Sequence, residues 1–572
     1  MKKILFLILI LPLFSFSSDE DIFKAMDIEI KRAMEKLELE NLGKAYYISL
    51  RLKDINLKTL YFSFGAEKNK DESHYRNLST IVRVGKPEFD QTNFSPSFDF
   101  GFYDLDYFTS VPLEDDLLIL RQTFWLSIDK AYKEAQEKLS KKKGFIEHHP
   151  QEKYSADFIK VEKPFIYIDE IPEMIDFELI YTLAKNLSSH LLKYDFLNEG
   201  NVTLFSLLKK QYFLDSEGSK HLKIEPIYSI QVSIDCFSSN YYPLSLNNSW
   251  VFKEKKDIPT EEVLKKELDE FINYLQTIRQ KDPMESYSGP VVFEGESSAA
   301  FFLSFLGKGV SGVREPLSGS TYSMPFKRGG FLGKKLNQKI MPSSFDVWDK
   351  PKLKEFNGKS LIGYIPVDDE GIEPADIQIV KEGKLINLPM RRTAFEDYLN
   401  LNGHAREGQF TVFSTDVDST VTNLIIEDKN GLSEEEFFEK LKDYGESEGI
   451  EKILFIKKLK KAFALTEIET DIFSFAEGLK SAISPPMVMY LYDLKTGKKE
   501  YIWGLEFVSL SENVLKDILF SSKKQSISQI YEVLSMDSLS YSVVAPEYVL
   551  IEDISLKKTK LQRIKKPLVE MP

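Results

Sequence analysis

Side chains able to bind a cation or move a proton are concentrated in three short stretches of this chain. The first is the run Asp368-Asp369-Glu370, followed directly by Gly371. Three carboxylates in one turn offer oxygen ligands for a cation and groups for acid–base chemistry. The same run is also typical of a solvated hairpin turn closed by the glycine. We favour the hairpin interpretation, because no histidine or cysteine lies near the run in the sequence.

The second stretch is centred on His404, which has Asn402, Gly403 and Arg406 beside it. A neutral imidazole is a common metal ligand. One histidine does not make a zinc site, because such a site takes at least three protein ligands. We expect His404 to order its loop, or to line a groove, through hydrogen bonds. The alternative is a metal site built from His404 and the 368–370 turn, which requires both to lie within bonding distance of one ion.

The third stretch is Glu147-His148-His149, placed between a lysine-rich run and Pro150. These flanks indicate an exposed linker, and a weak adventitious metal site there stays open. The motifs of other common chemistries are missing, since the sequence has no G-x-S-x-G elbow, Walker loop or C-x-x-C pair. The single cysteine, Cys236, has no partner for a disulfide within the chain. We interpret it as a buried apolar residue.

Composition and charge narrow the class of protein. The chain has 572 residues, of which 42% are hydrophobic and 13% aromatic, so it can bury a large core and form more than one domain. Its formal net charge is −14 and its pI is about 5.3. Non-specific binding to a phosphate backbone needs a basic surface. The charge therefore argues against a nucleic acid as the main partner.

The N-terminus has the pattern of a secretory signal. Lys2-Lys3 precede an apolar run from Ile4 to Phe16, and Ser15-Phe16-Ser17 is a small-x-small cleavage site. The apolar run is shorter than a bilayer requires and stops at Asp19-Glu20-Asp21. We expect a signal peptide at residues 1–18, export to a periplasm or out of the cell, and no stable membrane insertion after cleavage.

Residues 19–285 have the periodicities of helices that cover an antiparallel or mixed sheet. Apolar spacing of three to four residues predicts helices, and alternation of apolar and polar residues predicts half-buried strands. The expected helices are 21–42, 117–143, 176–192 and 261–280, and the expected strands are 45–54, 60–66, 79–85 and a hairpin that turns at 216–218. In the second helix, Trp125, Tyr132 and Leu139 recur every seven residues, which predicts that all three pack in the core.

Residues 286–572 are rich in strands and turns. Such a pattern is typical of a curved antiparallel sheet or a partly closed barrel. The sequence therefore predicts an α+β protein in three parts, which are the signal segment 1–18, a helix-and-sheet domain at 19–285 and a β-rich domain at 286–572.

Residues 289–314 read GPVVFEGESSAAFFLSFLGKGVSGVR, which is an apolar strand, an acidic turn and a helix with the apolar run Ala299 to Leu306. This layout resembles the TldD/PmbA family. In the catalytic branch of that family the matching helix reads H-E-x-x-x-H, with two zinc-binding imidazoles and a glutamate general base. Here the three positions hold Leu303, Ser304 and Lys308.

These substitutions remove the chemistry that the resemblance would otherwise imply. Leucine has no donor atom, the lysine ammonium repels a dication, and serine cannot replace the carboxylate base. Two ligands five residues apart lie about 140° apart on a regular helix and converge only through a π-type widening. Leu303 and Lys308 form no metal bonds that would stabilise this distortion. We therefore expect a buried core helix that begins after a strand.

The resemblance runs along nearly the whole mature chain in the family's order. Each patch is short, and it is their order along the chain that carries the comparison. The patches are 76–94, the helix that opens at Pro112, 365–390, 402–406, 422–424 and 542–556.

The resemblance implies a heterodimer of a zinc-bearing subunit with a zinc-less one called PmbA or TldE. We predict that this chain is a non-catalytic homologue that binds a peptide or protein ligand, or pairs with itself or with a family subunit, and that it holds no zinc. The alternatives are an active peptidase with ligands outside the usual helix and a structural envelope protein. The predicted peptide-groove residues are Gly307, Gly309, His404, Arg406 and Asn423.

Overall fold

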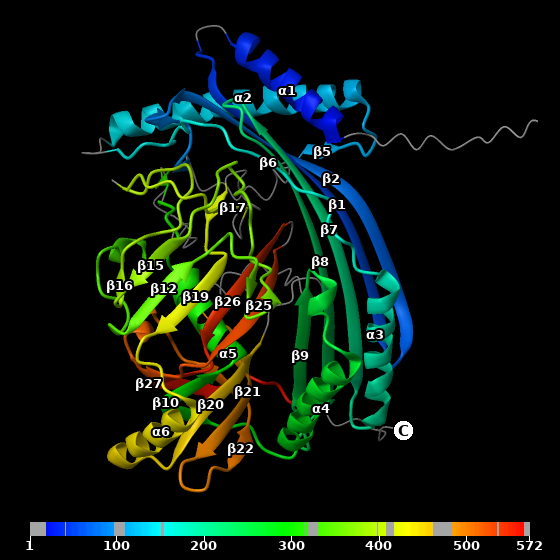
Figure 1. Cartoon of the computed structure of the whole chain (residues 1–572), viewed down its shortest axis with the longest axis vertical. Helices are drawn as coiled ribbons and strands as arrows, with labels where there is room; N and C mark the ends of the chain where they lie inside the picture. The colour runs from blue at the N-terminus through cyan, green and yellow to red at the C-terminus, as the bar shows by residue number, and fades with distance from the viewer. Residues whose placement is uncertain are drawn as a thin grey trace, which may run out of the picture.

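The computed structural model describes residues 19–39, 42–95, 109–149, 154–314, 316–318, 330–396, 398–407, 417–460, 483–534 and 537–564. The predicted signal segment lies outside these ranges. Within them, no helix is both long enough and apolar enough to cross a membrane. The described chain has two halves, a long curved sheet with its helices and a lobe built on two further sheets (Figure 1).

The N-terminal half is built on an eight-stranded sheet in the order β3-β2-β1-β7-β8-β6, with β5 on β2 and β9 on β8. The strands that we expected separately at 45–54, 60–66 and 79–85 belong to two long strands, which turn at Phe64 and Gly65 with positive φ. The strands are β1 (Ala45–Ser63), β2 (Ala66–Lys86), β3 (Phe89–Asp90), β5 (Thr109–Val111), β6 (Ile166–Ile168), β7 (Glu199–Asp215), β8 (Lys220–Phe237) and β9 (Pro243–Phe252).

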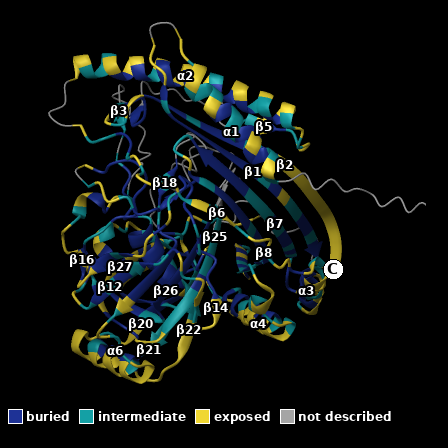
Figure 2. Ribbon diagram, turned by 45° about the horizontal axis from the view of Figure 1, so that its top comes forward, coloured by how far each residue is buried: buried dark blue, intermediate teal, exposed yellow. Residues whose placement is uncertain are grey.

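Alternation along these strands separates an apolar face from a charged one. Even-numbered side chains such as Leu50 and Leu52 of β1 pack under helices, and odd-numbered ones such as Arg51 and Lys53 point the other way, toward the C-terminal half. Both faces are buried over residues 47–53 in the first half of β1, whereas the first part of β2 is exposed (Figure 2). The prediction of half-exposed strands was therefore wrong for β1.

The helices of this half agree with the predicted ones to within a few residues at most ends. They are α1 (Asp19–Lys36), α2 (Leu117–His148), α3 (Phe177–His190) and α4 (Glu261–Ile278). Asp116 caps α2 by accepting from the backbone N–H groups of Leu118 and Ile119. Tyr132 and Leu139 are buried, as predicted. Trp125 is 46% exposed beneath the guanidinium of Arg32, so its predicted core position was wrong.

The C-terminal half contains two mixed sheets. One has the order β22-β21-β20-β10-β27-β23, with β24 on β27, and the other is β16-β15-β12-β19-β26-β25. The pairs β10–β20 and β19–β26 are parallel, and neither sheet closes into a barrel within the described chain. The prediction of a purely antiparallel sheet or partly closed barrel is corrected accordingly, while the α+β class is confirmed.

The main elements of this half follow. They are β10 (Ser286–Glu294), α5 (Glu296–Phe302), β12 (Phe345–Asp349), β15 (Ile377–Lys381), β16 (Lys384–Leu385), β19 (Asn423–Asp428), α6 (Glu434–Glu448), β20 (Lys452–Leu459), β21 (Pro486–Asp493), β22 (Lys499–Ile502), β23 (Leu505–Phe507), β24 (Ile518–Ser521), β25 (Gln525–Leu534), β26 (Asp537–Pro546) and β27 (Tyr548–Lys558). Short two-stranded pairs also join β4 (Phe94–Ser95) to β11 (Leu317–Ser318), β13 (Glu355–Phe356) to β14 (Lys359–Ser360) and β17 (Ala405–Arg406) to β18 (Asp418–Ser419).

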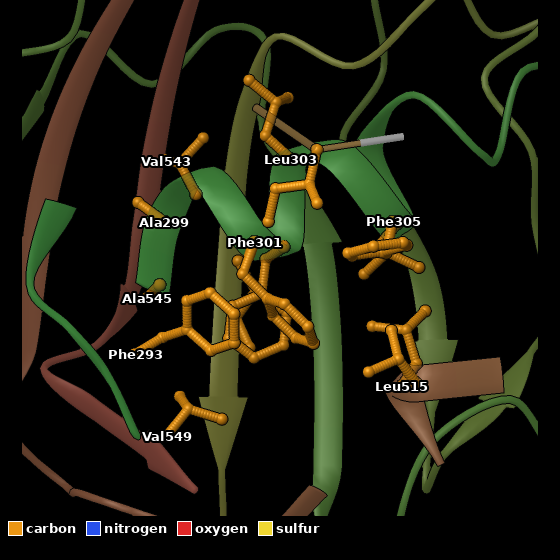
Figure 3. Packing of buried hydrophobic residues seen from close by; sticks show 14 of the residues in the cluster. Phe293, Ala299, Phe301, Leu303, Phe305, Leu515, Val543, Ala545 and Val549 are labelled. Atoms are coloured by element: carbon orange, nitrogen blue, oxygen red, sulfur yellow. The ribbon is translucent and has the colours of Figure 1, made fainter. Parts of the chain in front are cut away.

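Helix α5 lies at the centre of the C-terminal core. It contacts β10 and β20 of one sheet and β25 and β26 of the other. The rings of Phe293 in β10 and Phe301 in α5 pack together with centroids 4.8 Å apart and planes inclined by 32°, and both side chains are fully buried (Figure 3). The sequence 289–314 thus forms a strand and a buried core helix, as predicted.

Candidate functional site

The segment that resembles the zinc helix ends in a π-turn. Residues Leu303–Gly307 follow α5 without a break, and the N–H of Lys308 donates to the carbonyl of Leu303 at 2.8 Å. This bond joins residues five apart, which is the widening that brings positions 303 and 308 toward one side of a helix. We expected an undistorted helix here, so the structure corrects that point.

The side chains at this turn do not offer a metal site. Leu303 is 3% exposed and belongs to the main core cluster, and it lies on the opposite side of the helix from Phe301 (Figure 3). The ammonium of Lys308 lies 2.7 Å from a carboxylate oxygen of Glu532 in β25. Zinc binds nitrogen, sulfur or oxygen donors with free lone pairs, so these positions do not fit the ion.

The π-turn is fixed by close packing around a glycine. A Cβ added at Gly307 would come within 2.8 Å of Cδ1 of Leu303 and 3.1 Å of Cγ2 of Val421. Gly309 is equally confined, because its Cβ would meet the Phe331 ring at 2.7 Å. Among the described residues, neither glycine has room beside it even for a methyl group.

We expect Gly307→Ala to lower the free energy of unfolding by about 1–3 kcal/mol, since overpacking a tight core forces its neighbours off their rotamers. The measurement is the shift in the urea denaturation midpoint. Gly144→Ala in α2 is the matched control, because nothing lies within 4 Å of its added Cβ. That control should be neutral or stabilising by about 0.5–1 kcal/mol. An equal response of the two variants would contradict the packing argument.

His404 orders a buried loop. Its Nδ1 lies 2.9 Å from the carbonyl of Asn402, and its Nε2 lies 3.0 Å from Oδ2 of Asp349. Both His404 and Asp349 are fully buried, and Asp349 also accepts from the N–H of Thr422. The Nδ1 contact agrees with the loop-ordering prediction, while Nε2 lies beside Asp349 without forming a hydrogen bond of good geometry.

The carboxylate turn is buried, and the prediction of a solvated hairpin was wrong. Asp368, Asp369 and Glu370 are 0%, 8% and 6% exposed. Asp369 accepts from the side-chain amide of Gln211 at 2.8 Å and pairs with the ammonium of Lys223. The turn of the C-terminal half therefore binds the charged face of the N-terminal sheet.

Strand register aligns the basic residues that meet this turn. Lys53 of β1 lies opposite Gln211 of β7, which lies opposite Lys223 of β8. One residue pair further along the same face, Arg51 of β1 donates to the backbone carbonyl of Asp369 at 2.8 Å. The carboxylate of Glu407, just after β17, forms ion pairs with both Arg51 and Lys53.

Neighbouring charges shift the pKa values of these two buried aspartates in opposite directions. The pKa of Asp369 is held well below its usual value against the cost of burial, mainly by the charges of Lys223 and Arg51. Burial, followed by the charge of Glu370, raises the pKa of Asp368 to about 8, although backbone N–H groups of Ile372 and Ala405 oppose the shift. Two adjacent carboxyls thus hold different protonation states at neutral pH.

A small polar cavity lies between the two halves at this point. It has room for about one water molecule. Its walls include Lys53, Lys209, Gln211, Lys223, Glu225, Asp369, Arg406 and Glu407. A space of this size suits a buried water and is far too small for a peptide.

The alternative metal site built from His404 and the turn finds no ligand set. The loop does lie against the turn, because the N–H of Ala405 donates to Asp368 at 3.1 Å. The His404 ring, however, is directed to Asp349. Among the described residues, no group of three or more His, Cys, Asp or Glu side chains could hold a metal ion. His148 and His149 are exposed at the end of α2, and Cys236 is buried as predicted, with its thiol pKa raised by burial to about 11.

The five predicted groove residues are all buried in this structure. Arg406 is 7% exposed and donates to the carbonyl of Ser540 at 2.9 Å. Asn423 is fully buried, and its amide donates to the carbonyls of Lys350 and Leu353. With Gly307, Gly309 and His404, they form packed or hydrogen-bonded structure around α5 and the β17 loop.

Comparisons of the sequence and of the structure with known proteins agree with each other. Residues 286–474 match the family model described as the PmbA/TldA metallopeptidase C-terminal domain. No curated protein matches the sequence. The chain is similar to solved structures of TldE from Thermococcus kodakarensis (12% identity, TM-score 0.58, 93% of this chain and 100% of that chain covered) and of a proposed DNA gyrase modulator from Thermotoga maritima (12%, 0.58, 93% and 99%). A third similar structure is that of a proposed DNA gyrase modulator from Bacteroides thetaiotaomicron. It has 12% identity and a TM-score of 0.57, and the match covers 95% of this chain and 99% of that chain.

The shared fold and the matched domain define a two-part α+β protein with a metallopeptidase-type C-terminal domain. Residues 286–474 are thus similar to the C-terminal domain of the PmbA/TldA metallopeptidases, and the chain shares its fold with the solved TldE structure.

Proposed function

We propose that this chain is an exported member of the TldD/PmbA family that lacks the zinc peptidase chemistry and acts as a partner subunit. The observation that supports this most directly is the π-turn at Leu303–Gly307. Its backbone has the widened form that an H-E-x-x-x-H motif needs, yet Leu303 is a core residue and Lys308 is ion-paired with Glu532. The positions of the zinc ligands are used for packing and for an ion pair.

Between a peptide-binding role and a partner role, the geometry favours the partner. The space beside Leu303 and Gly307 is filled by Val421 and Leu424, and Phe331 lies against Gly309. A bound peptide at this place would have to displace buried apolar side chains, and burial of a large apolar side chain is worth about 1.5–3 kcal/mol. We therefore place the function of the chain in association with another protein.

The test is metal analysis and cleavage by the mature chain, residues 19–572. We expect far less than one zinc per chain by plasma mass spectrometry, and no cleavage of an unstructured peptide library with or without added zinc. The control is a relative with an intact H-E-x-x-x-H helix, purified in the same way, which should bind zinc and lose cleavage on chelation.

One tightly held zinc per chain, lost together with cleavage on treatment with a chelator, would overturn the proposal. Co-expression with the zinc-bearing relative adds the partner test. Stable co-purification of the two chains supports the partner role, and failure to associate with any copy of the family, itself included, contradicts it.

A further inference from the structure

One edge strand of the N-terminal sheet carries exposed apolar side chains. Among the described residues, strand β6 (Ile166–Ile168) is the last strand of the sheet and pairs only with β8. Ile166 is 65% exposed, Ile168 is 49% exposed and Ile171, just beyond the strand, is 81% exposed. Soluble proteins usually protect such edges with charged residues, prolines or a covering element. Lys163 and Pro164 before the strand and Glu170 and Pro172 after it protect its two ends in this way, whereas the three strand residues between them present isoleucines that a partner strand can cover.

The register shows which backbone groups are available at this edge. The N–H of Lys220 donates to the carbonyl of Phe165 at 3.0 Å, and the N–H of Asp169 donates to the carbonyl of Leu222 at 2.9 Å. In a parallel ladder every second residue directs both its backbone groups to the partner. Residues 165, 167 and 169 therefore face β8, and the N–H and C=O groups of Ile166 and Ile168 face outward.

We propose that β6 pairs antiparallel with β6 of a second copy of this chain, with the two-fold axis at Tyr167. In that register Ile166 of each copy lies opposite Ile168 of the other. Each such pair exchanges both of its outward-facing hydrogen bonds, which is the closely bonded pair of an antiparallel ladder. The exposed isoleucine side chains then cover each other across the strands. A C2 contact of this kind uses the same patch on both subunits.

The charges beside the strand favour this occupant and this direction. Lys160, Glu162 and Lys163 precede the strand, and Asp169, Glu170 and Glu173 follow it, so the leading end is net basic and the trailing end is acidic. Antiparallel pairing sets the basic end of one copy beside the acidic end of the other, whereas parallel pairing would bring like charges together. Lys163 and Glu170 are exposed, and neither forms an ion pair within the described ranges of the chain. The patch is thus complementary to itself, whether or not the chain binds zinc.

The first test uses the geometry of the axis. A symmetric antiparallel pairing brings only one strand position, Tyr167, opposite its own copy. We expect Tyr167→Cys to form a disulfide-linked dimer under mild oxidation, visible on a non-reducing gel. Leu192→Cys is the control, because Leu192 is also 65% exposed but lies elsewhere. The native Cys236 is 2% exposed and does not interfere.

The second test leaves the strand backbone unchanged and reads association by sedimentation equilibrium of the mature chain. We expect a dimer whose dissociation constant rises at least about tenfold in Ile168→Lys and in the single charge reversals Lys163→Glu and Glu170→Lys. The double reversal Lys163→Glu with Glu170→Lys should restore the wild-type value. A monomer at all concentrations overturns the proposal. So does a dimer that Ile168→Lys leaves unchanged, since it would use another surface.

Discussion

Replacing Asp369 with alanine is expected to lower the free energy of unfolding by about 3–5 kcal/mol, the cost of leaving a buried charge without its partner. The variant removes the carboxylate that pairs with Lys223 and accepts from Gln211. Lys223 has a side chain only 7% exposed, so bulk solvent does not hydrate the ammonium that is left without its partner. The measurement is the shift of the urea denaturation midpoint at neutral pH, together with the thermal midpoint.

A surface ion pair from the same region provides the control. Glu373 pairs with Lys352 at 2.9 Å, but the two side chains are 54% and 48% exposed. Exposed pairs contribute little, so Glu373→Ala should cost less than about 1 kcal/mol. If Asp369→Ala is no more damaging than Glu373→Ala, the buried junction between the two halves does not stabilise the molecule as argued.

Asp368 is expected to make the wild-type protein less stable as the pH rises from 5 to 8. Its folded pKa is raised from 3.8 to about 8, mainly by burial and then by the charge of Glu370. Between these values the folded chain holds a proton that the unfolded chain has released, so stability falls as pH rises. Each pH unit within that window lowers the free energy of unfolding by up to about 1.4 kcal/mol.

Asp368→Asn removes this pH dependence, because the amide does not ionise. Between pH 5 and pH 8, we expect the free energy of unfolding of the wild type to fall by about 2–4 kcal/mol relative to that of the variant. The variant also loses the acceptor for the N–H of Ala405, a cost that does not vary with pH. Urea titrations at several pH values measure the slope, and exposed Asp376→Asn is the control. Parallel curves for wild type and Asp368→Asn would refute the assignment.

Much of the element order was predictable because it rests on local patterns. The helices at 176–192 and 261–280 end within two residues of α3 and α4, since side-chain caps and apolar spacing mark both. The failures have physical causes. The charged face of β1 has the alternation of a strand that faces water. Nothing in the local sequence predicts that the acidic turn 368–370, which is distant in the chain, covers this face. The exposed position of Trp125 depends on α1 covering only part of α2.

The candidate site was only partly accessible to sequence reasoning. The missing donors at Leu303 and Lys308 follow from residue types alone. The π-turn cannot be predicted in this way. It is maintained by tight contacts of Gly307 with the side chain of Leu303, whose position depends on its rotamer, and with Val421, which is distant in the sequence. The burial of Asp368 and Asp369 likewise depends on Arg51 and Lys223, more than 140 residues away along the chain.

The origin of the π-turn has a consequence for how such sites evolve. In this chain the unusual backbone of Leu303–Gly307 is held by apolar contacts and an i to i+5 hydrogen bond, with side chains that cannot ligate. The scaffold therefore shapes the backbone before any ion arrives. Ligand residues on such a scaffold can be exchanged without rebuilding the helix, so catalytic and non-catalytic lineages can diverge by a few side-chain replacements on one preorganised frame.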